Sequence, residues 1–124
     1  KEFIIFNYDA LEMYRSVYIC EGALNALTIG DRGIATMGKA ISGYQVNELL
    51  KSSCERFIIL LDPDAKKYAI NLALKLVAYK KVKVVFLPEG KDVNDLGRKE
   101  TLRLVYQTRY QSYQDLIQIR NSLE

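Results

Sequence analysis

Four short apolar runs, rich in β-branched residues, alternate along the chain with longer stretches of mixed apolar and polar positions. The runs cover residues 17–20, 34–37, 57–61 and 82–87. Nearly continuous apolar runs of this length are typical of strands covered on both faces, as in parallel sheets. The pattern therefore predicts four strands of a mainly parallel sheet, and residues 3–6 are either a fifth strand or an extended lead-in.

The stretches between these runs have the spacing of amphipathic helices. Apolar residues recur every three or four positions in 22–31, 42–52 and 65–80, and Ser42 is a suitable N-cap for the second stretch. Residues 100–122 have similar spacing and are predicted to form one helix. This alternation predicts right-handed βαβ units, and hence a compact α/β domain in which helices flank a four- to five-stranded, mainly parallel sheet.

The chain is expected to contain a core and two flanking segments. Residues 1–15 are expected to lead in from a missing upstream domain, residues 16–97 to form the core, and residues 98–122 to form a C-terminal helical extension. The last two residues, Leu123-Glu124, are typical of the remnant that precedes a purification tag.

The composition excludes several kinds of chemistry. The 124 residues are 49% hydrophobic and 27% charged, which fits one soluble domain. No apolar run reaches the roughly 20 residues of a membrane span and no signal peptide is visible, so we expect a cytoplasmic protein with no membrane partner. The absence of His excludes catalytic triads and His-based metal sites. Cys20 and Cys54 form no CxxC motif, and we expect both to be reduced and buried.

Acidic residues follow three of the four predicted strands. Glu21 comes directly after the first strand, Asp62 and Asp64 after the third, and Asp92 and Asp95 after the fourth. The carboxyl ends of parallel strands meet at one edge of a sheet, where α/β proteins bind their ligands. Residues i and i+2 of an extended segment point to the same side, so Asp62 and Asp64 can face one point.

Carboxylates gathered in this way repel one another, and a cation among them relieves the repulsion. Oxygen ligands without His or Cys favour Mg²⁺ or Mn²⁺. The alternative is that these acids cap helices, with Asp64 capping the helix after it and Glu21 lying at the positive end of a helix dipole. Taken singly the acids favour capping, whereas their coincidence after three strands favours a metal site.

The charge balance favours an anionic partner. The chain has 18 basic and 15 acidic residues, and setting aside the five acids above leaves 18 basic and 10 acidic residues. A basic body around an acidic pocket is expected of a metal-dependent enzyme that acts on nucleic acid. A solvated, lysine-rich helix face is the alternative explanation.

The ordered motifs resemble those of the Toprim domain, which occurs in bacterial DnaG-type primases, phage primase-helicases, topoisomerases and some nucleases. Glu21-Gly22, Met37-Gly38 and Asp62-Pro63-Asp64 stand in the order of that family, and the resemblance covers residues 15–97. The segment 87–96 is similar to the leucine-proline and glycine-lysine-aspartate segment of primases, which favours the primase branch.

The resemblance implies a Toprim catalytic domain of a DNA primase, which makes RNA primers by metal-dependent nucleotidyl transfer. Its partners would be a single-stranded DNA template, ribonucleoside triphosphates and a replicative helicase or fused helicase domain. A Toprim nuclease is one alternative, and a non-catalytic module that binds nucleic acid or docks a helicase is another. Template-binding and zinc modules of primases lie in other domains, so the isolated domain is expected to be incomplete.

The resemblance also implies roles for individual residues. Three departures from primases stand out: Asn25 and Asn94 replace acids, and Ala65-Lys66-Lys67 lacks a usual glycine, which is typical of a divergent, phage-like member. The implied catalytic residues are Glu21, Asp62 and Asp64, and the implied metal ligands are these three with Asp92. The candidate nucleotide or nucleic-acid contacts are Gly22, Gly38, Lys39, Lys66, Lys67 and Lys91, and the supporting candidates are Asn25, Asn94 and Asp95.

Overall fold

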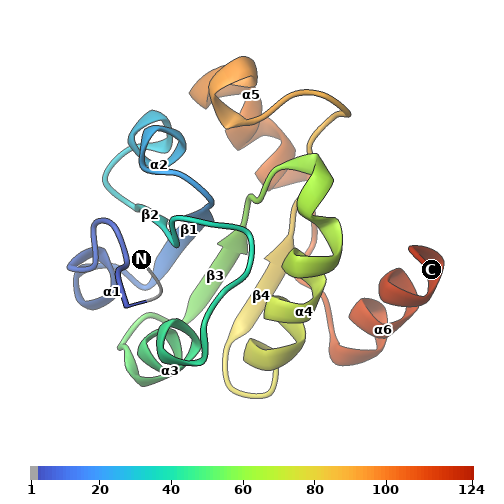
Figure 1. The fold of residues 1–124 in the computed structure, drawn as a ribbon, viewed down its shortest axis with the longest axis horizontal. Helices are drawn as coiled ribbons and strands as arrows, with labels where there is room; N and C mark the ends of the chain where they lie inside the picture. The colour runs from blue at the N-terminus through green and yellow to red at the C-terminus, as the bar shows by residue number, and fades with distance from the viewer. Residues whose placement is uncertain (1–2) are drawn as a thin grey trace.

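The four apolar runs form one sheet in the computed structural model, which describes residues 3–124 (Figure 1). All strand pairs are parallel, and the strand order is β2-β1-β3-β4. This arrangement confirms the predicted fold class, with four strands rather than five. The strands are β1 (Ser16–Cys20), β2 (Gly33–Ala35), β3 (Arg56–Ile59) and β4 (Lys81–Val84).

The three helices predicted between the strands are present, and a short first helix was not predicted. Ser42 is the N-cap of the helix after β2 and forms a capping box with Gln45, as the sequence indicates. A single turn of 3-10 helix, η1 (Pro63–Ala65), precedes the helix after β3. The helices are α1 (Ala10–Met13), α2 (Ala23–Ile29), α3 (Gly43–Lys51), α4 (Lys66–Leu76), α5 (Val93–Gln107) and α6 (Tyr113–Ser122).

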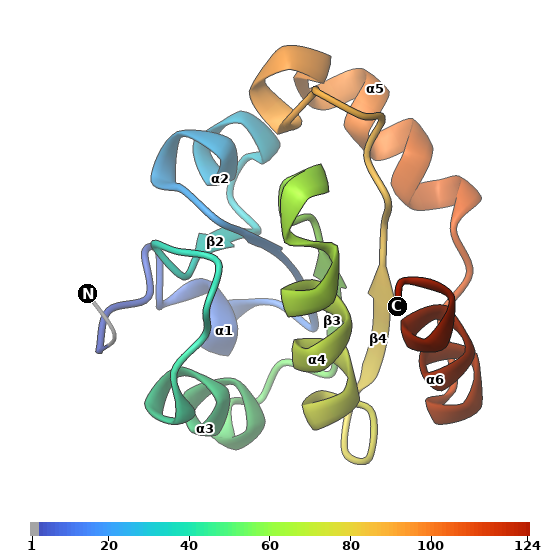
Figure 2. The same cartoon turned by 45° about the vertical axis from the view of Figure 1, so that its right-hand side comes forward.

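Helices cover both faces of the sheet (Figures 1 and 2). Successive side chains of a strand pack into two separate apolar clusters, one on each face. Val17 and Ile19 of β1 pack in the cluster formed with α1, α3, α4 and α6. Tyr18 and Cys20 of the same strand face the cluster formed with α2 and α5. Burial on both faces explains why the strands have nearly continuous apolar sequences.

The prediction of one helix over residues 100–122 is wrong. Helix α5 begins at Val93, contains a kink at Gly97 (φ 81°) and ends at Gln107, and α6 starts only at Tyr113. The segment between them binds the open edge of β4, where the amide of Gln111 donates to the Val82 carbonyl at 3.0 Å. The Gln111 side chain also bonds the amide and carbonyl of Val84 at 2.8 and 3.1 Å. The unpaired groups of an edge strand therefore break the helix.

The N-terminal segment forms a single bridge rather than a fifth strand. Phe6 pairs with Ala35 in antiparallel orientation, through backbone hydrogen bonds of 2.9 and 3.3 Å. The buried side chain of Gln45 donates to the carbonyls of Ile4 and Thr36, at 2.7 and 2.8 Å. These contacts hold residues 4–6 beside the loop that follows β2.

One polar residue interrupts the apolar run of β4. Lys83 is only 7% exposed, and its Nζ donates to the carbonyls of Val105 and Thr108 at 2.8 and 2.9 Å. It also lies 4.7 Å from the centre of the Tyr110 ring. A lysine that bonds the last carbonyls of a helix complements the negative end of the helix dipole, so Lys83 fixes the C-terminal end of α5.

Both cysteines are buried and free, as predicted. Burial, with a smaller contribution from the charge of Asp62, raises the pKa of the Cys20 thiol to about 12. Within residues 3–124, each helix is too short or too polar to cross a bilayer.

Candidate metal centre

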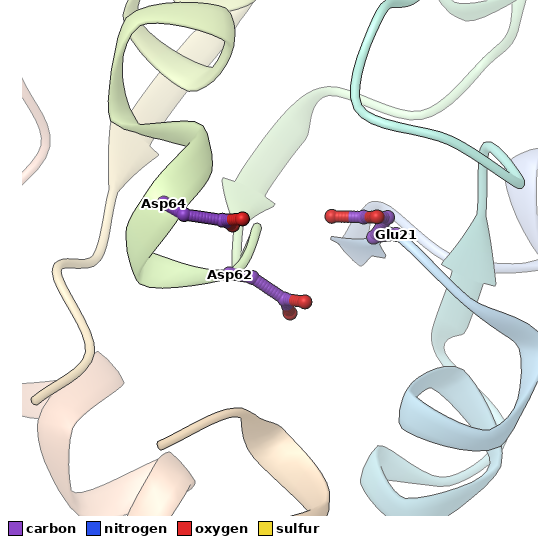
Figure 3. A group of neighbouring side chains, drawn as sticks. All are labelled: Glu21, Asp62 and Asp64. Carbon is purple, nitrogen blue, oxygen red and sulfur yellow. The ribbon is translucent and has the colours of Figure 1, made fainter. Parts of the chain in front are cut away.

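Three carboxylates converge at the carboxyl edge of the sheet (Figure 3). Glu21 follows β1 directly, and Asp62 and Asp64 lie at the corner between β3 and α4. One oxygen from each carboxylate lies within 4.8 Å of the other two. Figure 3 shows Asp62 and Asp64 reaching from one side toward the Glu21 carboxylate on the other. The structure thus brings together the three acids that the sequence analysis assigned as catalytic.

The strand order explains why these acids meet. The chain passes from β1 to β2 on one side of β1, whereas β3 pairs on the other side. The connections therefore diverge at the carboxyl ends of β1 and β3, which is the topological switch point where open α/β sheets bind ligands. Glu21 and Asp62 stand on the two sides of this point.

Local geometry separates Asp62 and Asp64 from ordinary capping residues. Asp62 occupies the N-cap position of η1, but its side chain makes no capping hydrogen bond. Helix α4 likewise has no side-chain cap, because its N-cap position is Ala65. Pro63 at the start of the turn fixes the step between the two acids. The capping interpretation is therefore wrong for this pair.

The surroundings of Asp62 disfavour the charged form of its carboxyl group. Its Oδ1 is buried and has no hydrogen-bond partner within residues 3–124. Burial raises the pKa of the Asp62 carboxyl, and the negative charges of Asp92 and Asp64 raise this pKa further. A buried carboxylate oxygen without a partner costs free energy that a cation can recover.

The donor set fits a hard divalent cation. The three side chains offer only carboxylate oxygens, which Mg²⁺ and Mn²⁺ prefer. The unpartnered oxygen of Asp62 supplies a ligand atom that no other group within residues 3–124 uses. Glu21, Asp62 and Asp64 are thus the residues that would hold such an ion.

Lys39 lies beside the same cluster. Its Nζ is 2.7 Å from Oδ2 of Asp64 and forms an ion pair with it. Because β2 and β3 both flank β1, the loop after β2 and the corner after β3 approach each other across the end of β1. The sequence analysis assigned Lys39 a phosphate contact and missed this ion pair, because only the strand order reveals it.

Asp92 and Asp95 cap helix α5. Oδ1 of Asp92 accepts from the amide of Asp95 at 2.9 Å, and Oδ2 of Asp95 accepts from the amide of Asp92 at 3.0 Å. This reciprocal pair is a capping box, which is the alternative that the sequence left open for these acids. Asp92 does not belong to the group of acids that converge within 4.8 Å. Its charge nevertheless raises the pKa of Asp62, and its role as a further ligand remains a prediction.

The two asparagines that replace acids of primases lie on helices that pack together. Asn94 accepts a hydrogen bond of 2.6 Å at its Oδ1 from the Thr28 hydroxyl, which joins α5 to α2. Asn25 is buried on α2. The structure therefore gives Asn94 a packing role, and supporting roles for both at the site remain predictions.

The remaining candidate contacts lie at the starts of α2 and α4 or in the loops after β2 and β4. Gly22 is the N-cap of α2, and Gly38 accepts at its carbonyl from the Thr36 hydroxyl at 3.1 Å. Lys66 is half-buried, with its Nζ 5.9 Å from the centre of the Phe86 ring. The side chains of Lys67 and Lys91 are exposed.

A parallel α/β sheet with carboxylates at its switch point is the arrangement that the Toprim resemblance predicts. Residues 18–97 match the family described as Toprim-like, and the chain belongs to this family. This result confirms the resemblance that the ordered motifs indicate.

The chain is similar in sequence to a DNA primase and in fold to a primase catalytic core. The chain is 27% identical over 112 residues to a DNA primase of Lactococcus lactis subsp. lactis (strain IL1403), covering 83% of this chain and 17% of that protein. Its fold matches the E. coli primase catalytic core with a TM-score of 0.74 and 17% sequence identity, over 99% of this chain and 44% of that one. The chain thus spans less than a fifth of the curated relative.

Proposed function

We propose that this chain is the metal-dependent core of a DNA primase, which joins ribonucleotides on a single-stranded DNA template. The observation that carries the proposal is the convergence of Glu21, Asp62 and Asp64 at the switch point, with a buried oxygen of Asp62 that has no hydrogen-bond partner in residues 3–124. The similarity to a DNA primase supports this choice within the Toprim-like family.

The reaction would be phosphoryl transfer. The 3′-hydroxyl oxygen of one nucleotide attacks the α-phosphorus of an incoming ribonucleoside triphosphate, and pyrophosphate leaves with the electrons of the broken P–O bond. A bound Mg²⁺ or Mn²⁺ would neutralise the charge that develops on the phosphoryl oxygens.

Different residues would bind the cation, accept the proton and contact the phosphates. Asp62 and Asp64 hold the cation, and Glu21 is either a further ligand or the base that accepts the hydroxyl proton. Asp92 is proposed as an additional ligand. Lys39, Lys66, Lys67 and Lys91 are proposed to contact phosphate groups, and a replicative helicase or a fused helicase domain is the proposed protein partner.

The first experiment tests the metal centre. We expect Mn²⁺ to broaden the amide NMR signals of residues 20–22 and 61–65, and Asp62→Asn to abolish this localised broadening. Asp31→Asn is the matched control, because Asp31 is exposed and lies outside the cluster. Uniform weak broadening in the wild type and in Asp31→Asn would contradict a metal centre at these acids.

A second experiment tests the reaction. With Mg²⁺ or Mn²⁺, labelled ribonucleoside triphosphates and a single-stranded DNA template, we expect short oligoribonucleotides that disappear in the Asp62→Asn variant. Cleavage of labelled DNA without synthesis would identify a nuclease instead. Localised Mn²⁺ binding with neither product would reject primer synthesis by this chain.

A further inference from the structure

We infer that Lys39 is a positioning residue that competes with the divalent cation for Asp64 and, when displaced, binds a phosphate of the ribonucleoside triphosphate. The inference rests on the proposed function and adds to it a link between the two ligands. Its new element is the ion pair between Lys39 and Asp64, which the family resemblance does not supply.

The competition follows from the position of the ammonium group. Nζ of Lys39 lies 2.7 Å from Oδ2 of Asp64, and Asp64 is one of the three carboxylates that converge within 4.8 Å. The hydrogen bond to Asp64 and the charge of Asp64 raise the pKa of Lys39, and the charge of Glu21 raises this pKa further, so the ammonium also lies in the field of Glu21. The ammonium and a divalent cation that bind the same carboxylate weaken each other's binding, because each neutralises the charge that attracts the other.

The backbone holds Lys39 beside the cluster. The amide of Met37 donates to the Glu21 carbonyl at 2.8 Å, and the Thr36 hydroxyl donates to the Gly38 carbonyl at 3.1 Å. Met37 has a φ of 65°, a left-handed conformation that is uncommon for a residue with a long side chain. The loop after β2 is thus tied, two residues before Lys39, to the backbone of the candidate ligand Glu21.

The side chain of Lys39 has room to move from Asp64 to a substrate. It is 41% exposed, and a lysine carries its charge on a flexible four-carbon stem. Lys39 also lines a concavity of about 560 Å³ together with Gly38, Met37 and Phe3. This volume is in the range of small-molecule sites, and lysine is a common phosphate ligand.

The inference predicts reciprocal effects on the two ligands. Removing the ammonium should strengthen cation binding and weaken triphosphate binding, because Asp64 loses its competitor while the phosphate loses its contact. Thermodynamic linkage requires the same coupling factor whichever ligand is added first.

The test is calorimetric titration of Mn²⁺ and, separately, of ATP in the presence of saturating Mn²⁺. We expect Lys39→Met to bind Mn²⁺ about two- to fivefold more tightly than the wild type, which is the range for an exposed ion pair. The same variant should bind ATP less tightly. Lys39→Arg should restore both affinities toward wild-type values, since it keeps the charge. Lys75→Met, which removes an exposed charge elsewhere on α4, should change neither.

A double-mutant cycle with Asp64→Asn separates the ion pair from a general charge effect. In the Asp64→Asn background, we expect Lys39→Met to leave Mn²⁺ affinity unchanged. Equal or weaker Mn²⁺ binding by the single Lys39→Met variant would overturn the inference while leaving the proposed function intact. A wild-type chain that binds no Mn²⁺ would reject both.

Discussion

Replacing Asp62 by Asn should stabilise the fold while destroying its proposed metal centre. In the folded chain Asp62 carries a charge that is partly buried, lies near two other carboxylates and has an oxygen without a hydrogen-bond partner in residues 3–124. Asparagine has nearly the same shape and removes the charge. The substitution therefore relieves repulsion and desolvation without leaving a cavity.

The magnitude follows from the separation of the carboxylates. At the 4.8 Å limit within which the carboxylate oxygens lie, two unit charges repel by about 3.5 kcal/mol at an effective dielectric constant of 20. The Asp64 side chain is 65% exposed and paired with Lys39, so solvent and the ammonium screen most of this repulsion. We expect a net gain of about 1 kcal/mol in the free energy of unfolding, which corresponds to a rise of about 4 °C in Tm for a domain of this size.

The pH dependence provides an internal check of the sign. Because the pKa of Asp62 is raised in the folded state, the folded chain binds more protons than the unfolded chain between the unfolded value, near 3.9, and the raised folded value. The destabilisation from Asp62 is therefore present in full above the folded pKa and disappears as the pH falls through this window. The advantage of Asp62→Asn should be largest at pH 7 and should vanish near pH 3.5.

Urea denaturation with EDTA, followed by circular dichroism at several pH values, measures this difference. Added Mn²⁺ should raise the stability of the wild type and leave Asp62→Asn unchanged, since only a ligand that binds the folded state stabilises it. Asp31→Asn is the control: in EDTA it should be as stable as the wild type, and Mn²⁺ should stabilise it to the same extent as the wild type. A variant that is less stable than the wild type at pH 7, or a difference that does not shrink on acidification, would refute the electrostatic reasoning.

Two further substitutions test the packing that positions the site. Gly33→Ala should destabilise the fold by about 3 kcal/mol in urea denaturation, because the added Cβ would lie 2.3 Å from the Ala26 carbonyl oxygen. The control is Gly43→Ala, whose added Cβ meets nothing within 4 Å and which should stabilise the fold by about 0.5 kcal/mol. Lys83→Met should lower the free energy of unfolding by about 2 kcal/mol and speed hydrogen exchange at the C-terminal end of α5, because two carbonyls lose their donor. The control Lys81→Met, at an exposed position, should change neither quantity. Equal exchange rates in Lys83→Met and the wild type would contradict the capping role.

The parts of the fold that could be predicted are those determined by residues close together in the sequence. Each strand is an apolar run between turn residues, and α3 begins at Ser42, whose capping box with Gln45 involves residues three positions apart. The parallel arrangement alone predicts that the acids lie at the carboxyl edge of the sheet. None of these inferences needs the strand order.

The parts that could not be predicted depend on contacts between distant segments. The break before α6 arises because Gln111 binds the backbone of Val84, 27 positions away, and no helical periodicity reports such a contact. Lys39 meets Asp64 because β2 and β3 both flank β1. The role of Lys83 likewise depends on the contact between β4 and the C-terminal end of α5.

The effect of a substitution on stability distinguishes an acid that caps a helix, such as Asp92, from an acid proposed to bind a cation, such as Asp62. Oδ1 of Asp92 accepts from the Asp95 amide, so Asp92→Ala should lower the free energy of unfolding by about 1 kcal/mol in EDTA. Asp62 makes no such bond, and its neutralisation should raise stability instead. If Asp92 also binds the cation, its alanine variant should in addition lose part of the Mn²⁺-induced stabilisation. A variant that is destabilised in EDTA but keeps the full Mn²⁺ effect would restrict Asp92 to capping, because a residue that only holds a helix end contributes equally with and without the ion.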